Sequence, residues 1–343
     1  MNYLLFRTDR IGDFLITLPI IKSIKRNNQN SKIYIVGSEK NFLYLKKNYL
    51  IHKVFLLKSN NLIGKLMLCL ELKKYIFDVI IISDKKNRSI FISFFLKAKK
   101  KIFNVSRFFQ KKILNIFYKD VFLDNDTLVN RSIGELLKDN CNAMGISLKK
   151  EDFNYFKIDQ FKKDFLQSNL IKLDNLDFVV FHYDEKWEIN NYRKMFKKAS
   201  NYTDINTDYK KVIKFLSNLA IKTSKKIIIT TGTLDTRVIE DLKRVSIQLN
   251  EFIYEINLFN TKAFLLTDQN FYSISHLISK SKLLISCHGA FTHIASNYNI
   301  KILDIIEKNK KNHYSRITKN MNNHKQIYRD KFTELSQQII SYS

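Results

Sequence analysis

The sequence predicts an α/β protein built from two successive domains of similar size. At 343 residues the chain is longer than one hydrophobic core commonly supports, so two domains are expected. Short apolar runs alternate with amphipathic stretches, which is typical of βα units around a parallel sheet. The alternation stops in a polar stretch at 146–176 and then begins again. We therefore expect two Rossmann-like domains, at 1–160 and 161–343.

The expected elements follow the apolar runs and their period. In the first half we expect strands at 3–6, 32–36, 53–57, 78–82 and 101–105, and helices at 14–25, 42–49, 62–74, 90–97 and 128–144. Gly145 follows the last of these helices, where a C-terminal cap belongs. In the second half we expect strands at 177–181, 226–230, 252–255, 282–285 and 301–305, and helices at 209–223, 236–249, 272–281, 291–298 and 331–342. The last helix could return to pack on the N-terminal domain.

The composition is strongly basic, with 59 Lys and Arg against 32 Asp and Glu and a formal net charge of +27. Such a charge favours nucleic acid, an anionic membrane surface or a phosphorylated substrate as partner. A bias toward Lys would also spread charge over every solvated face, and the low counts of 7 Gly and 1 Pro fit such a bias. The aromatic residues lie within strands and helices instead of in basic stacking motifs, so we do not expect nucleic-acid binding.

Three cysteines, Cys69, Cys141 and Cys287, lie far apart and form no CxxC pair. They suggest neither a zinc site nor a disulfide framework, and a reducing cytoplasm suits them. Charged residues begin at Arg7, which is atypical of a signal peptide, and no stretch reaches the roughly 18 apolar residues of a membrane span. We expect a cytoplasmic protein, soluble or associated with the inner face of the cytoplasmic membrane.

The segment RTDRIGD at 7–13 directly follows the first expected strand. Ligands of open parallel sheets lie beyond the carboxyl ends of the strands, so this turn is a candidate site. Gly12 permits a tight backbone, and Asp13 would lie near the N-terminus of the next helix. From spacing alone Asp13 is either a helix cap or a catalytic carboxylate. The arginines of the segment could likewise pair locally with its carboxylates.

A second candidate turn, at 286–292, precedes an expected helix in the second half. The backbone N–H groups of Gly289 and Ala290 would lie at the helix N-terminus, which favours anions. The alternative is an ordinary βα turn that needs Gly for its geometry. His293 on that helix could contact a ligand or simply be packed. Thr231 begins a Thr-Gly-Thr turn that could contact a nucleotide, although turn chemistry explains it as well.

Residues 7–25, RTDRIGDFLITLPIIKSIK, resemble the N-terminal signature of the heptosyltransferase family, glycosyltransferase family 9, whose members have the GT-B fold. Residues 128–146, LVNRSIGELLKDNCNAMGI, resemble the helix before that family's interdomain crossover. Residues 283–296, LLISCHGAFTHIAS, resemble its strand–turn–helix ending in His-hydrophobic-Ala. The resemblance implies a GT-B fold with an acceptor-binding N-terminal domain and a C-terminal domain for a nucleotide-sugar donor.

The resemblance also implies an inverting, metal-independent glycosyltransferase without a cofactor. The donor would be a nucleotide-diphosphate sugar similar to ADP-heptose, and the acceptor an anionic lipid-linked glycan such as lipopolysaccharide. Asp13 would be the general base that takes the proton of the acceptor hydroxyl. Arg10, Arg88 and Arg131 are expected on the acceptor side. The expected donor-binding residues are Lys186, which matches the lysine of the family's FHYDEKW-like turn, together with Thr231, His288, Gly289, Ala290 and His293.

The chain departs from the family pattern at two turns of the second domain. Where the family carries an acidic residue followed by Ser or Thr and Gly, this chain has His288-Gly289-Ala290. His182 replaces a small residue in its own turn. With His293, these histidines suggest a positively polarised pocket directed at phosphate, since their spacing does not favour a metal site.

Three alternatives stay open. Asp124 and Asp126 form a DxD after an apolar run, as in metal-dependent glycosyltransferases of another fold, although Asp126 also suits a helix cap. The basic run 97–101, with Arg88 and Arg107, could line the acceptor side or simply be solvated. The chain could also be a degenerate GT-B protein that binds nucleotide or anionic glycan without transfer.

Overall fold

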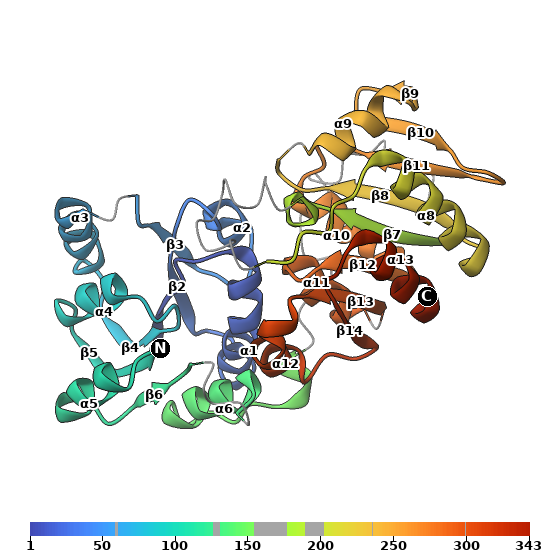
Figure 1. The fold of residues 1–343 in the computed structure, drawn as a ribbon. Coiled ribbons are helices and arrows are strands. Elements are labelled where there is room, and N and C mark those ends of the chain that lie inside the picture. Colours follow the sequence, from blue (N-terminus) through green and yellow to red (C-terminus); the bar gives the residue numbers. More distant parts are fainter. Residues whose placement is uncertain (59–60, 126–130, 154–176, 189–201, 235, 299) are drawn as a thin grey trace. The chain divides into compact units, whose positions relative to one another are not determined.

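A computed structural model of the chain describes residues 1–58, 61–125, 131–153, 177–188, 202–234, 236–298 and 300–343. The chain divides into two compact units (Figure 1). The first comprises Met1–Phe161 with Ser315–Asn320, and the second comprises Lys162–Tyr314 with Met321–Ser343. The domain boundary expected at 160/161 lies outside the described residues.

The first unit contains a parallel sheet of six strands in the order β3-β2-β1-β4-β5-β6. The strands are β1 Asn2–Phe6, β2 Lys32–Gly37, β3 Lys53–Leu56, β4 Phe77–Ile82, β5 Ala98–Val105 and β6 Val121–Leu123. The strand order reverses between β1 and β4, and such a reversal opens a crevice at the carboxyl ends of the two strands. The segment 7–13 and the residues after β4 therefore meet at this point.

The helices of the first unit are α1 Ile11–Asn27, α2 Phe42–Lys46, α3 Leu62–Leu72, α4 Asn87–Phe94, α5 Phe108–Phe117 and α6 Ile133–Ala143. Helix α1 packs against α6, whereas α3, α4 and α5 share one core with the sheet. Gly145 has a φ of +73°, which confirms the predicted C-terminal cap of α6. The sequence did not predict α5 or β6.

Among its described residues the second unit has a sheet of eight strands in the order β14-β13-β12-β7-β8-β11-β10-β9. Neighbouring strands are parallel, except that β10 runs antiparallel to both β11 and β9. They are β7 Phe178–Tyr183, β8 Lys226–Thr231, β9 Ile247–Asn250, β10 Ile253–Asn257, β11 Lys262–Leu266, β12 Leu283–Cys287, β13 Lys301–Ile306 and β14 His324–Tyr328. The helix predicted at 236–249 is therefore too long. It ends as α9 at Arg244, because the residues after it pair with β10 instead.

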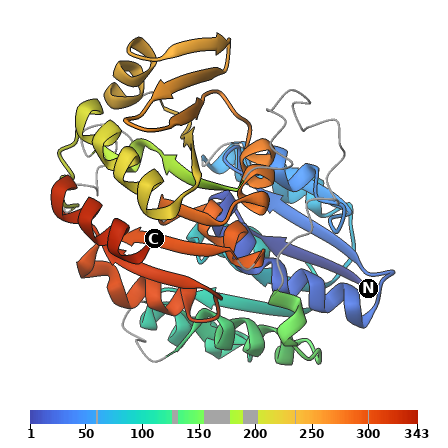
Figure 2. The same cartoon turned by 90° about the vertical axis from the view of Figure 1, so that its right-hand side faces the viewer.

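The remaining helices are α8 Tyr209–Thr223, α9 Arg237–Arg244, α10 Phe271–Lys280, α11 Ala290–Asn297, α12 Lys311–Thr318 and α13 Phe332–Tyr342. Helix α13 packs on α8 and β14 (Figure 2). The ring of Phe332 on α13 lies 5.8 Å from that of Phe215 on α8. The terminal helix groups with the second unit. The segment Ser315–Asn320, at the end of α12, is the part of the C-terminal half that groups with the first unit.

Cys69, Cys141 and Cys287 are all buried and unpaired. In the described ranges, the helices are all too short or too polar to cross a bilayer.

Candidate active site

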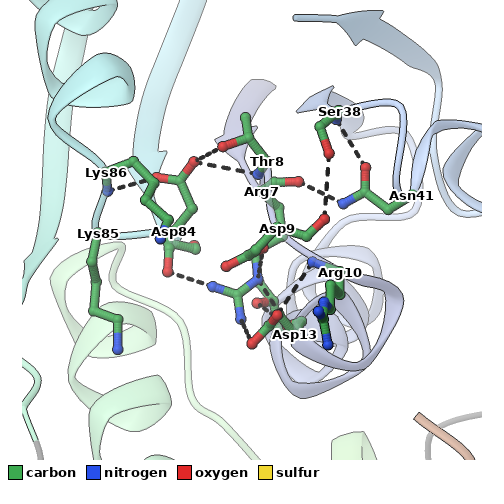
Figure 3. A network of polar contacts seen from close by, with 12 residues as sticks. Arg7, Thr8, Asp9, Arg10, Asp13, Ser38, Asn41, Asp84, Lys85 and Lys86 are labelled. Carbon is green, nitrogen blue, oxygen red and sulfur yellow. Dashed lines mark hydrogen bonds and ion pairs between the residues drawn. The ribbon is translucent and has the colours of Figure 1, made fainter. Parts of the chain in front are cut away.

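Arg7 is the centre of the polar network after β1 (Figure 3). Its Nε donates to the backbone oxygen of Asp13 at 2.8 Å, and its Nη1 donates to that of Ser83 at 2.5 Å. The same guanidinium forms ion pairs with Asp9 at 3.3 Å and with Asp13 at 3.8 Å. Arg7 is buried, so these contacts bind the end of β1 to the start of α1 and to the end of β4.

Asp84 forms the second link between these turns. Its carboxylate accepts hydrogen bonds from the Thr8 hydroxyl at 2.5 Å and from the Ser89 hydroxyl at 2.7 Å, and also from the backbone N–H of Lys86 at 3.2 Å. Sequence analysis missed this residue. Its position directly after an apolar strand, at the carboxyl edge of the sheet, is the signal that could have indicated it.

Asp13 both caps its helix and keeps an exposed carboxylate. Its Oδ2 accepts the backbone N–H of Arg10 at 3.2 Å, which is half of a capping box at the start of α1. The side chain is still 43% exposed. The two roles that the sequence left open are therefore compatible, since one carboxylate can cap the helix and remain accessible to a substrate.

Asp9 is a second carboxylate of this turn that sequence analysis did not select. Burial raises its pKa to about 7, and the charges of Asp13 and Asp84 act in the same direction, whereas Arg7 opposes the shift. Its side chain is 20% exposed. A carboxyl group with a pKa near neutrality can take up or release a proton during a reaction, so Asp9 joins Asp13 as a candidate acid or base.

The three arginines expected on the acceptor side occupy different places in the first unit. Arg10 is exposed at the start of α1. Arg88 donates to the hydroxyl of Thr8 at 2.7 Å and therefore belongs to the network around Arg7. Arg131 donates to the backbone oxygen of Leu123 at 3.0 Å and pairs with Asp139, which commits it to the region between β6 and α6.

A basic cavity of about 440 Å³ opens beside this network. Five cations and no carboxylate line it among the described residues: Lys65, Lys85, Lys86, Arg88 and Arg107, with Asn87, Ser106 and Gln110. Arg88 and Arg107 thus line one cavity, beyond the ends of β4 and β5. The basic run 97–101 does not join them, because it begins β5 and so lies toward the opposite edge of the sheet.

Asp124 is held by two cations. Lys85 lies 2.8 Å and Arg316 2.7 Å from its carboxylate oxygens. Burial alone would raise the pKa of Asp124, but Lys85 and Arg316 outweigh it and hold the pKa below the ordinary value. The other acid of the DxD, Asp126, lies outside the described residues. Within the described ranges there is no cluster of three His, Cys, Asp or Glu residues suited to a metal ion.

In the second unit, Lys186 binds the turn after β7 to the turn after β12. Its Nζ lies 2.8 Å from Asp184 Oδ2, 2.9 Å from the backbone oxygen of His288 and 3.3 Å from that of Cys287. Burial alone would lower the pKa of Lys186, but Asp184 outweighs it and raises the pKa above the ordinary value. The ammonium has three protein acceptors for its three hydrogens, so a contact with phosphate requires it to give one up.

Gly289 and Gly232 let these turns approach closely. A Cβ on Gly289, which precedes α11, would lie 3.0 Å from Lys186 Nζ. A Cβ on Gly232, directly after Thr231, would lie 2.8 Å from the Cβ of Asp184. Neither glycine has a positive φ, so the restriction at each position is one of space, and it is stricter at Gly232 than at Gly289. Ala290 is the first residue of α11, whose N-terminus faces the same turn.

His288 is held by a fully buried carboxylate. Its Nδ1 lies 2.7 Å from Asp304 Oδ2, and His324 Nε2 lies 2.9 Å from the same oxygen. Thr292 donates to the other oxygen of Asp304 at 3.3 Å. Burial would raise the pKa of Asp304, but His288 and His324 hold it well below the ordinary value. Sequence analysis missed both Asp304, inside an apolar strand, and His324, on an unpredicted one.

The structure places the three histidines of the expected positively polarised pocket in different surroundings. His182 is buried, lies 2.9 Å from Thr230 Oγ1, and packs on the ring of Phe291. Burial lowers the pKa of His182 to about 4, so this imidazole is neutral near pH 7. His293 is buried on α11, with its ring edge-on to that of His288 at 5.5 Å. Of the three, His288 is the least buried.

No protein-family model matches the sequence, and no curated protein matches it. Solved structures do match. The E. coli heptosyltransferase WaaC with ADP is similar over 100% of both chains, with a TM-score of 0.63 and 12% identity. The E. coli ADP-heptose LPS heptosyltransferase II is similar over 100% of this chain and 97% of its own, with a TM-score of 0.63 and 10% identity.

A family 9 glycosyl transferase from Veillonella parvula gives a comparable result, with a TM-score of 0.64 and 12% identity over 99% of this chain and 90% of that one. At such identities the similarity concerns the fold. The predicted fold class is confirmed, because the chain has the GT-B fold of these glycosyltransferases along its whole length.

Proposed function

We propose that this protein is a glycosyltransferase that moves a sugar, heptose or a related one, from a nucleotide-diphosphate donor to an anionic cell-envelope glycan. The observation that carries the proposal is the exposed carboxylate of Asp13, fixed after β1 by Arg7 and by the backbone of Arg10. A base at the carboxyl edge of a Rossmann-like sheet is suited to accept a proton from a bound hydroxyl.

The reaction we propose is a direct displacement with inversion. The acceptor oxygen forms a bond to the anomeric carbon, and Asp13 takes the proton from that oxygen. The bond from the anomeric carbon to the diphosphate breaks, and its electron pair leaves with the phosphate. The N-terminus of α11, which starts at Ala290, offers backbone N–H groups and a positive helix dipole to that charge. This route needs no metal ion.

The nature of the donor is supported by the solved structure of WaaC, which contains ADP. In this chain the turn after β12 would hold the diphosphate, with Thr231, Gly289, Ala290 and His293 as expected contacts. Lys186 has a second role in the proposal: it fixes the two turns to each other through the backbone of His288. His288 itself, in place of the family's acidic residue, would contact the donor through Nε2.

The nature of the acceptor is supported by the basic cavity of the first unit. Its five cations favour a ligand that carries phosphate or carboxylate groups. Such groups are common in lipid-linked envelope glycans, including lipopolysaccharide. We therefore propose that the protein works in the cytoplasm and makes peripheral contact with the inner face of the cytoplasmic membrane.

A second candidate function is binding without transfer, in a degenerate GT-B protein. The substitution of His288 for an acidic residue, together with its hydrogen bond to Asp304, favours this alternative. It differs from the first in one respect, since it predicts donor binding without turnover.

A thermal-shift screen tests both. The protein is heated with ADP-, UDP-, GDP- and CMP-linked sugars, with and without EDTA, and a ligand of the folded state raises the melting temperature. A shift with a diphosphate sugar that EDTA leaves unchanged is expected, followed by transfer to an envelope-derived acceptor. A melting shift without sugar transfer supports the binding protein. If no nucleotide sugar raises the melting temperature, both candidate functions are contradicted.

A further inference from the structure

Helices α3 and α5 expose an unusual number of large hydrophobic side chains. Five of the 11 residues of α3 and five of the 10 residues of α5 are large hydrophobics at least 42% exposed. We call these side chains the apolar face; the most exposed are Ile63, Met67, Phe109, Ile116 and Phe117. Large exposed apolar surfaces on soluble proteins commonly mark sites of contact with a protein or a membrane.

The apolar face is not a by-product of core packing. The inward side chains of these helices, Leu68 and Leu72 of α3 and Leu114 of α5, lie in the core that α3, α4 and α5 share with the sheet. Leu114 is the one buried residue of α5, a helix that the structure describes in full. The exposed residues are therefore additional to those that hold the helices in place. Figure 1 shows α3, α4 and α5 together on one side of the sheet.

The surroundings of this face are strongly basic. Residues 85–119, which include α4 and α5, contain eleven Lys or Arg and no Asp or Glu. The basic cavity lies at the N-terminal ends of the same helices, since Lys65 comes from α3, Arg88 from α4, and Arg107 directly precedes α5. Amphipathic helices that carry large apolar residues beside Lys and Arg are typical of proteins that lie in the interface of an anionic membrane.

We propose that α3 and α5 dock this protein on the surface of an anionic phospholipid bilayer. The apolar face enters the boundary between headgroups and acyl chains, and the basic cavity receives a lipid phosphate. A second copy of the chain is a poorer partner for this face. A symmetric dimer contact would place residues 85–119 of both copies together, and these segments carry many positive charges and no carboxylate. The link to a lipid-linked acceptor rests on the proposed function, whereas membrane binding itself does not.

Vesicle sedimentation of the full chain tests the proposal. The wild-type protein is expected to sediment with vesicles of phosphatidylglycerol and phosphatidylcholine, and much less with phosphatidylcholine alone. The triple variant F109S/I116S/F117S should lose about tenfold or more of this binding. The matched control I221S/I247S/F259S removes three exposed hydrophobics of the second unit and should bind as the wild type does. Unchanged binding of the F109S/I116S/F117S variant, or an equal loss in the control, would overturn the proposal.

Two further experiments distinguish membrane binding from the binding of a soluble anion and from dimer formation. Arg107→Gln together with Lys65→Gln should weaken binding to anionic vesicles, and added inorganic phosphate should displace the wild type poorly. Full displacement by phosphate would mean that the cavity serves a soluble anion. If sedimentation equilibrium shows a wild-type dimer that the F109S/I116S/F117S variant converts to monomer, and neither binds vesicles, the face is a dimer interface. The melting shift with nucleotide sugars is measured without vesicles. It therefore tests the proposed function independently of membrane binding.

Discussion

The carboxylate of Asp304 accepts a hydrogen bond from His288 Nδ1 at 2.7 Å. Asp304 lies in strand β13, whose remaining residues are all apolar except Lys301 at its start. This bond fixes the ring of His288 and directs its other nitrogen, Nε2, away from Asp304. His324 shares the same carboxylate oxygen at 2.9 Å. The residue that departs from the family pattern is thus part of a buried network, which indicates that it is integrated into the fold of the second unit.

This network predicts a loss of stability in Asp304→Asn. Removal of the charge weakens two hydrogen bonds to imidazoles, and hydrogen bonds to charged groups contribute about 1.5–3 kcal/mol each. Because the pKa of Asp304 is depressed in the folded state, its contribution is present above the ordinary Asp pKa and is lost as the pH falls toward the lower folded value. Urea denaturation should show a loss of about 2–3 kcal/mol near neutral pH. Asp330→Asn, at an exposed position, is the control and should change little.

Asp13→Asn should abolish most turnover without unfolding the protein. A positioned general base contributes roughly 10²–10⁴-fold, and an amide cannot take the proton. The amide oxygen can still accept the N–H of Arg10, so the helix cap should persist. Asp13→Ala loses the cap as well and should cost about 1 kcal/mol of stability. Single-turnover kinetics and donor titration separate the effects; full activity of Asp13→Asn would remove this residue from the mechanism.

The raised pKa of Asp9 predicts that the free energy of unfolding falls as the pH rises. Its folded pKa of about 7 exceeds the ordinary value of 3.8, so the folded state holds a proton that the unfolded state has lost between these values. The destabilisation of the folded state by Asp9 grows from about pH 4 to about pH 7, and its upper limit is about 4 kcal/mol of unfolding free energy. Asp9→Asn should therefore raise the melting temperature at about pH 8.5 more than at about pH 5. An equal effect at both pH values would show that Asp9 is ionised in the folded protein near neutrality.

The two glycines of the second unit should respond differently to alanine. In Gly289→Ala the new Cβ meets Lys186 Nζ at 3.0 Å, at the far end of a flexible side chain. In Gly232→Ala it meets the Cβ of Asp184 at 2.8 Å and its Cα at 3.1 Å, which cannot move without the backbone. We expect a loss of about 1–3 kcal/mol for Gly232→Ala and less for Gly289→Ala, measured by urea denaturation. Similar losses in both would contradict this account of the turns.

Some elements could be predicted from the sequence because local signals determine them. The buried parallel strands are continuous apolar runs, and the cap at Gly145 needs a residue that accepts a positive φ. Others could not be predicted. Strand β9 exists because it pairs with β10, and all four of its residues are exposed, so no buried apolar run marks it in the sequence. Pairing between strands is decided by partners that the local sequence does not specify.

The sequence by itself determined the two α/β halves and the turn at 7–13, since strand runs, helix periods and a compact motif are local properties of the chain. Only the tertiary structure decided which charges meet. It brought Asp84 to Thr8, Asp304 to His288 and Lys186 to the turn after β12, and each pair joins residues from separate elements. The pKa of a carboxylate and the accessibility of a cation depend on burial and on neighbours within a few ångströms. These depend on chain topology, and composition gives only the number of charges to be placed.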